Sequence, residues 1–159
     1  MQFINLQFSG GRDEVLAAIS NNEYVNRNVR FEEQDVKPLM KLKEKNGRVR
    51  VTCEMLGKPT KDNGFLVGTY FSGKLVEKNG ATRLKGIITT APIYHLAMLV
   101  LVCVFIYQCI SLKGFSVVPI LLVGLSLFMF KDEFKKQGYI KRYLSRAERR
   151  FNSDKSSTR

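Results

Sequence analysis

Residues that could carry out catalysis are few and scattered in this chain. His95 is the single histidine, and it stands near the start of a long uncharged run that contains no Asp or Glu to relay a proton. A Ser-His-Asp arrangement therefore lacks a histidine in the polar part of the chain. Glu32 and Glu33 are adjacent on an expected strand, so their carboxylates would point to opposite faces. We expect no enzyme activity, no catalytic residue and no cofactor.

The three cysteines give no sign of a metal centre. Cys53 belongs to an expected strand, whereas Cys103 and Cys109 are six residues apart within the uncharged run. This spacing matches neither the paired cysteines of a zinc site nor a disulfide framework. We expect all three to act as small buried hydrophobic residues, with no metal bound.

Two short glycine-containing segments could bind an anion. The segment GKPT at 57–60 lacks the upstream glycine and the spacing of a Walker motif, so we interpret it as a turn. The segment SGGR at 9–12 precedes an expected helix, whose first backbone amides could hold an anion. A strand-to-helix turn needs glycines for its geometry as well, and both interpretations of 9–12 stay open.

The sharpest functional feature is the basic segment 131–151. Its apolar residues fall on one helical face: Phe134, Ile140, Leu144, Ala147 and Phe151. The spacing predicts a basic amphipathic helix that continues a membrane helix or lies on the membrane beside it. Each cation near anionic lipid gains about 1 kcal/mol. We expect seven cations to contact anionic headgroups: Lys135, Lys136, Lys141, Arg142, Arg146, Arg149 and Arg150.

Two alternatives bear on that basic segment. The same charges would also serve as a topology signal that keeps this end of the chain inside the cell. No nucleic-acid-binding motif accompanies the segment, so we expect no nucleic acid partner. The end of the chain, 152–159, is polar and is expected to be disordered.

The element that must position these charges is an uncharged stretch in the middle of the chain. Residues 86–112 contain no Lys, Arg, Asp or Glu, and after Lys113 the same holds for 114–130. A 20-residue helix is about 30 Å long, which matches the hydrocarbon core of a bilayer.

These lengths predict a transmembrane hairpin over 92–130, with spans at 92–112 and 115–130. The second span is short and contains Pro119 and Gly124, so a re-entrant hairpin that does not fully cross is the alternative.

The charges on both sides of the hairpin predict its orientation. Residues 1–91 hold 15 Lys and Arg against 10 Asp and Glu, and residues 131–159 hold 10 against 4. Basic flanks are retained in the cytoplasm. The first residues, MQFINLQFSGGRDE, have neither the basic nor the apolar region of a signal peptide. We expect a two-pass protein of the cell membrane with both termini cytoplasmic.

The first 91 residues predict an α+β domain. A strand at 3–8 is followed by a short helix at about 12–22. Two alternating runs flank Asn46-Gly47, and two more flank Asn79-Gly80, which is the strongest local signal of a β-hairpin. We expect an antiparallel β-meander with one short helix, forming a cytoplasmic domain over 1–91. The transmembrane hairpin and the basic amphipathic C-terminal helix follow it.

One stretch resembles a pattern in small, uncharacterised bacterial membrane proteins with two membrane helices and a cytoplasmic β-rich domain. There, an F-x-G strand and a G-x-T-x-L-x-G strand lead through a proline into a two-helix hairpin. The matching residues here are Phe71, Gly73, Gly80, Thr82, Leu84, Gly86 and Pro92. The resemblance implies the architecture and no functional site.

The expected function is that of a membrane-anchored interaction or regulatory module. Its expected partners are the bilayer and anionic headgroups, with self-association through the hairpin. Two alternatives stay open. A small pore or holin-like oligomer would use the hairpin, although this stretch lacks the polar stripe of a conducting pore. A lipid-binding protein would use the apolar interior of the meander.

Overall fold

The computed structural model describes residues 1–30, 38–55, 68–111 and 117–157. In chain order the elements are β1 (Gln2–Phe8), α1 (Arg12–Ser20), α2 (Asn22–Asn26), β2 (Pro38–Lys45), β3 (Arg48–Met55), β4 (Thr69–Lys78), β5 (Ala81–Thr90), α3 (Pro92–Ser111) and α4 (Val117–Ser157). The expected α+β class with an antiparallel sheet is confirmed. The expected strand that contains Glu32 and Glu33 does not include Val29 or Arg30, and residues 31–37 lie outside the described part.

The sheet has five strands in the order β1-β5-β4-β3-β2, and every pair is antiparallel. Two tight turns build it. Asn46 and Gly47 have φ of 53° and 72°, and Asn79 and Gly80 have φ of 54° and 72°. Positive φ at both central residues is the geometry of a type I′ turn, which asparagine and glycine tolerate best. Both predicted hairpins are therefore confirmed, and β1 adds itself beside β5.

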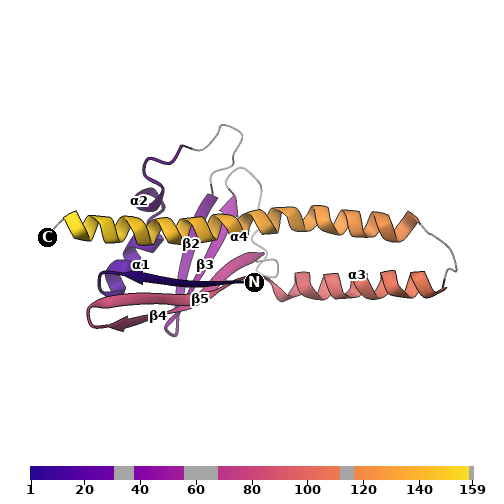
Figure 1. The fold of residues 1–159 in the computed structure, drawn as a ribbon, viewed down its shortest axis with the longest axis horizontal. Coiled ribbons are helices and arrows are strands. Elements are labelled where there is room, and N and C mark those ends of the chain that lie inside the picture. The colour runs from indigo at the N-terminus through magenta and orange to yellow at the C-terminus, as the bar shows by residue number, and fades with distance from the viewer. Residues whose placement is uncertain (31–37, 56–67, 112–116, 158–159) are drawn as a thin grey trace.

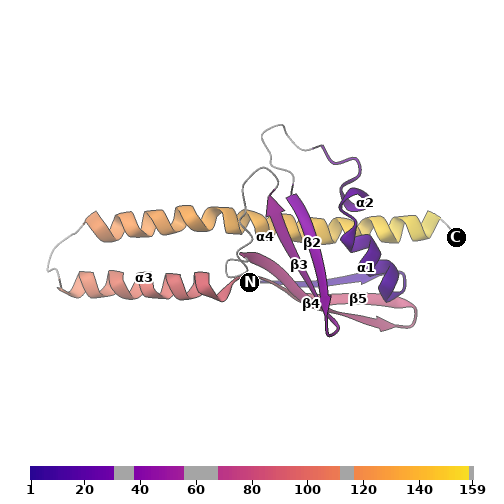
Figure 2. The same ribbon diagram turned by 180° about the vertical axis from the view of Figure 1, so that it is seen from behind.

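The second half of α4 covers one face of this sheet (Figures 1 and 2). Ile140, Leu144 and Ala147 are fully buried, and they belong to the same core as Phe8 and Phe71. Their spacing of three and four residues places them on one helical face, as the sequence predicts. That face packs against the sheet, however, whereas the sequence favoured a membrane surface for it. Phe134, assigned to the same face, is 66% exposed.

This packing corrects two boundaries. The domain cannot end at residue 91, because side chains of α4 beyond residue 139 complete its core. The helix also continues to Ser157, so residues 152–157 are helical where we expected disorder. Two polar contacts join this end of α4 to α1 and α2: Tyr24 Oη donates to Asp154 Oδ2 at 2.9 Å, and Lys155 Nζ pairs with Glu14 Oε2 at 2.9 Å. The Lys155 ammonium lowers the pKa of the Glu14 carboxyl.

The edge strand β1 is held to α4 by side chains that bond its backbone. Gln7 N donates to Glu148 Oε1 at 2.7 Å, and Ser9 N donates to Asn152 Oδ1 at 2.8 Å. Asn152 Nδ2 returns a bond to the Gln7 carbonyl at 2.9 Å. These bonds satisfy backbone groups that an edge strand otherwise presents to water or to another chain.

The helix α3 and the first part of α4 lie side by side and extend beyond the same end of the sheet (Figures 1 and 2). We call this pair the two-helix extension. Counting only the residues that the structure describes, no helix is both long enough and apolar enough to cross a bilayer. The expected spans 92–112 and 115–130 are not supported by this measure. Residues 112–116, including the expected turn, lie outside the described part.

Candidate functional site

The described residues contain no group of three or more His, Cys, Asp or Glu that could hold a metal ion. His95 Nε2 lies 3.0 Å from Thr90 Oγ1, so it joins the end of β5 to the start of α3. Cys53 is buried in the core, and burial raises its pKa to about 12, which keeps the thiol protonated. The segments 32–33 and 57–60 lie outside the described residues.

The glycine turn at 9–12 uses backbone amides for contacts within the chain. Ser9 N donates to Asn152 as described above, and Arg12 N lies 3.3 Å from Glu77 Oε2. The Arg12 side chain pairs with Glu44. An acceptor from elsewhere in the fold therefore already stands at two of the amides that an external anion would need.

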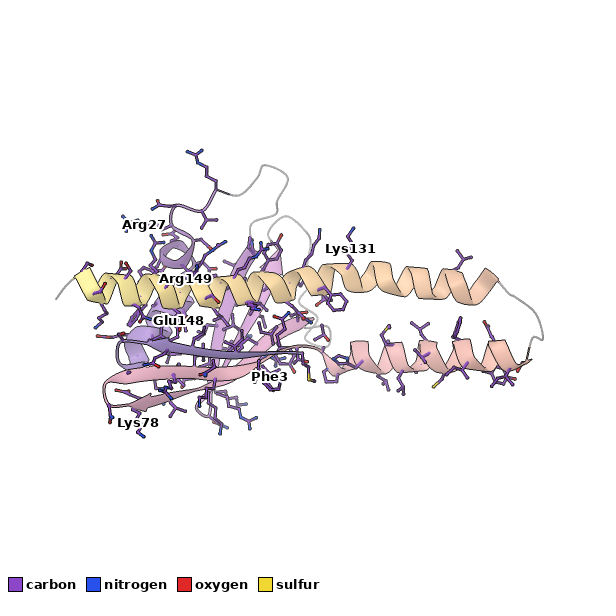
Figure 3. All side chains as sticks on the ribbon, viewed as in Figure 1. Phe3, Arg27, Lys78, Lys131, Glu148 and Arg149 are labelled. Carbon is purple, nitrogen blue, oxygen red and sulfur yellow. The ribbon has the colours of Figure 1, made fainter. Side chains whose placement is uncertain are left out.

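The seven cations expected at a membrane surface separate into two groups. Three bond within the fold. Lys136 Nζ pairs with Glu133 Oε1 at 2.6 Å, Arg146 Nη1 donates to Asn26 Oδ1 at 3.2 Å, and Arg150 Nη1 donates to the Tyr24 carbonyl at 2.8 Å. The other four are exposed along α4: Lys135, Lys141, Arg142 and Arg149. Figure 3 shows Arg149 far along α4 from the two-helix extension, with Lys131 much nearer to it.

A larger basic surface lies on the side of the sheet that α4 leaves open, and we call it the basic sheet face. Strand pairing aligns Lys85 with Lys74, Lys74 with Arg48, and Arg48 with Lys45. The four residues form one row across four neighbouring strands, and all are exposed. The buried residues Leu84, Val49 and Leu75 alternate with them along the same strands and point to α4 instead.

Further cations extend the basic sheet face on both sides of that row. The described exposed ones are Lys41, Lys43, Arg50, Lys78 and Arg83. Lys43, Lys45, Arg48 and Arg50 line a hollow together with Ser72, near the tip of the β2–β3 hairpin. Glu44 also lines this hollow and pairs with Arg12, and Glu54 on this face pairs with Lys41 at 2.7 Å. The described cations of the face outnumber these two carboxylates. The face therefore has a strongly positive potential.

An aromatic ring lies within this charged surface. The guanidinium of Arg50 lies over the ring of Tyr70, with Cζ 4.0 Å from the ring centroid. Phe3, on β1, is 82% exposed on the same side of the sheet and lies near the start of α3 (Figure 3). The basic sheet face thus combines cations with planar groups.

The sequence contained part of this signal. The alternation of Arg48 and Arg50 with Val49 and Val51 places the arginines on one face of a hairpin strand. Joining them to Lys74 and Lys85 requires the pairing of β3 with β4 and of β4 with β5 in register. Of these two pairings, only that of β4 with β5 follows from a tight turn, so the row could not be assembled from local patterns.

A buried carboxylate joins α4 to the sheet where the two-helix extension begins. Glu133 is 5% exposed; its Oε2 accepts from Thr69 Oγ1 at 2.9 Å, and its Oε1 pairs with Lys136. A Cβ added to Gly68 would lie 2.7 Å from Glu133 Cδ, so the glycine makes room for the carboxylate.

Replacing Glu133 should therefore destabilise this joint. Glu133→Ala leaves the partly buried Lys136 without its partner, and we expect a loss of about 3 kcal/mol in the free energy of unfolding. Glu133→Gln keeps an acceptor for Thr69 and should cost less. Thermal unfolding in detergent micelles measures both, and equal melting temperatures for the wild type and Glu133→Ala would contradict the role of the joint.

Comparisons with protein-family models, with curated proteins and with solved structures found no match. The resemblance carried by residues 71–92 therefore stays an expectation, and the function must be argued from the chain itself.

Proposed function

We propose that the protein is a membrane-anchored interaction module. In this proposal α3 and the first part of α4 enter the bilayer, and the basic sheet face meets a partner beside it. The observation that carries the proposal is the continuity of α4. One helix, Val117–Ser157, begins beside α3 and ends in the core of the domain. The two-helix extension and the domain are thereby joined by a stiff helix, without a flexible linker.

The surface of the extension supports its place in a bilayer. The described side chains of α3 include many exposed apolar ones: Leu96, Leu99, Val100, Val102, Val104, Phe105, Ile106, Tyr107 and Ile110. Burying one large aliphatic side chain that is otherwise exposed to water gains about 1.5–3 kcal/mol. In the sequence, 92–112 and 114–130 contain no Lys, Arg, Asp or Glu.

The path of the chain favours one orientation. The helix α3 starts directly after β5, and α4 returns to the same sheet. A hairpin that leaves and rejoins one domain keeps both chain ends on one side of the bilayer. The basic flanks favour the cytoplasmic side for that domain.

The direction of α4 limits which of its cations can meet headgroups. Arg149 is about 27 Å along the helix from Lys131, at about 1.5 Å per residue. Charges separated by more than about 8–10 Å are largely screened at physiological salt. We therefore propose headgroup contact for Lys131 and Lys135 and assign none to Arg142, Arg149 or Arg150.

Other functions have weaker support. A lipid-binding interior would need space between the sheet and α4, but Phe8, Phe71 and Leu84 are fully buried there. A pore would need polar side chains along the extension, and His95 is already bonded to Thr90. Self-association through the extension lacks an accessible polar group at Gln108, because its Oε1 is buried without a hydrogen-bond partner among the described residues.

Charged residues in the middle of α3 should release the protein from membranes. Each arginine at the centre of a membrane helix costs about 2.5–3.5 kcal/mol of insertion free energy. We expect the wild type to float with membranes after an alkaline wash and Leu99→Arg/Ile106→Arg to remain largely in the soluble or aggregated fraction. Val76→Arg, at an exposed apolar residue of the sheet, is the matched control and should float. Release of the wild type by the wash would reject membrane anchoring.

A further inference from the structure

We propose that the basic sheet face binds a single strand of nucleic acid. The inference rests on the proposed function in one respect, since it names the partner of the face that we assign to interaction. Phosphates would lie on the row formed by Lys85, Lys74, Arg48 and Lys45. A base would stack on the plane formed by Arg50 and Tyr70.

The row offers cations at a regular spacing. Neighbouring strands are about 4.8 Å apart, so the row extends over about 14 Å. Alternate residues of one strand are about 6.7 Å apart, which places Lys43 and Arg50 beside the row as a second line of charge. A groove of cations that follows a phosphate backbone is the shared feature of proteins that bind single strands.

The stacked pair supplies the second feature of such surfaces. Arg50 Cζ lies 4.0 Å from the Tyr70 ring centroid, so the guanidinium is held over the ring in the middle of the face. Unpaired bases stack on aromatic rings and on arginine planes alike. Because every base has such a face, this contact predicts binding with little sequence preference.

Two other partners fit the face less well. Protein interfaces are depleted in lysine, whereas Lys41, Lys43, Lys45, Lys74 and Lys85 all lie on this surface. The bilayer that holds the extension is also badly placed, because β1, β4 and β5 run along the direction of α3 and α4 (Figures 1 and 2). The sheet is therefore roughly perpendicular to the plane of such a bilayer, and its basic face does not lie against the membrane surface.

The sequence-based expectation of no nucleic acid partner considered the charges of the C-terminal helix alone. The basic sheet face is assembled only by the pairing of strands. The exposed cations of the C-terminal helix provide the control for the test below.

The test uses the full-length protein in nanodiscs of zwitterionic lipid and a short fluorescent single-stranded RNA, followed by anisotropy. Four neutralised phosphates predict a fall in affinity of about 50-fold between 50 and 200 mM salt. The row variant Lys45→Gln/Arg48→Gln/Lys74→Gln/Lys85→Gln should lose most of this salt dependence and bind at least tenfold more weakly. Lys141→Gln/Arg142→Gln/Arg149→Gln removes three exposed charges from α4 that we assign to no contact, and this variant should bind like the wild type.

A second pair of variants separates stacking from charge. Tyr70→Ala should weaken RNA binding by about fivefold or more, whereas Tyr70→Phe should retain it, because the ring and not the hydroxyl holds the Arg50 guanidinium on which the base stacks. Equal losses in the row and α4 variants would overturn the proposal. So would displacement of RNA by an acidic peptide at equal affinity, or equally tight binding of separate anionic vesicles.

Failure of this inference and failure of membrane anchoring give different results. RNA binding without flotation would reject the anchoring and keep the nucleic acid site. Flotation without RNA binding at low salt would reject the nucleic acid site and keep the anchored module. The row variant should float like the wild type in either case.

Discussion

Leu144→Ala should raise the frequency of transient unfolding of the domain far more than a substitution on the exposed side of the same helix. Leu144 is fully buried where α4 crosses the sheet. Removing a buried leucine side chain costs about 2–5 kcal/mol, because the surrounding core closes only partly over the cavity. That is a large part of the 5–15 kcal/mol that stabilises an ordinary domain. Truncation after Thr90, which removes all of α4, should leave no folded domain.

Cys53 reports this opening from inside the full-length protein. It is buried in the same core, and its raised pKa keeps it protonated in the folded state. In a background with Cys103→Ser and Cys109→Ser, a thiol reagent should label Cys53 at least about 30-fold faster in Leu144→Ala than in the parent, since 1.4 kcal/mol is tenfold. Phe134→Ala, on an exposed part of α4, is the control and should label at the parent rate. A folded domain from the truncated chain would refute the role of α4.

Features that depend on residues close in the sequence are the easiest to predict from it. The turns at Asn46-Gly47 and Asn79-Gly80 are encoded by two residues each, and the sequence predicts both hairpins correctly. The apolar stripe of α4 was also recognised, because it needs only the spacing of Ile140, Leu144 and Phe151. The predicted partner of that stripe, a membrane surface, was wrong, because the stripe packs against the sheet. An apolar face flanked by lysine and arginine suits both partners equally well.

The longest-range contacts were the least predictable. Tyr143 Oη donates to the Ile19 carbonyl at 2.8 Å, although 124 residues separate them. The whole uncharged stretch lies between these two residues in the sequence. It indicates a domain boundary at residue 91, whereas residues on both sides of the stretch belong to one core. The row of the basic sheet face is equally hard to predict, because Arg48 and Lys85 are aligned only by strand order, with Lys74 of β4 between them.

Gly86→Ala should disrupt the centre of the sheet. Gly86 pairs directly with Gly73 across β5 and β4, and the ring of Phe71 lies against both. A Cβ on Gly86 would lie 2.5 Å from Gly73 Cα and 2.7 Å from Phe71 Cε2, and it would also meet the Ser72 carbonyl oxygen. Two of these three neighbours are backbone atoms, so the strands must separate to make room. We expect a loss of about 1–3 kcal/mol or more, as for other overpacked cores.

Gly11→Ala is the matched control for Gly86→Ala, because a Cβ there meets nothing within 4 Å and its φ is −70°. Thermal unfolding in micelles should show a clear fall in melting temperature for Gly86→Ala and little change for Gly11→Ala. Gly73→Ala should behave like Gly86→Ala, and the double variant should cost less than the two losses added, since both disturb one contact. Simple additivity would contradict the shared packing of Phe71. The F-x-G and G-x-T-x-L-x-G pattern would then need a reason other than this close approach of two strands beneath one ring.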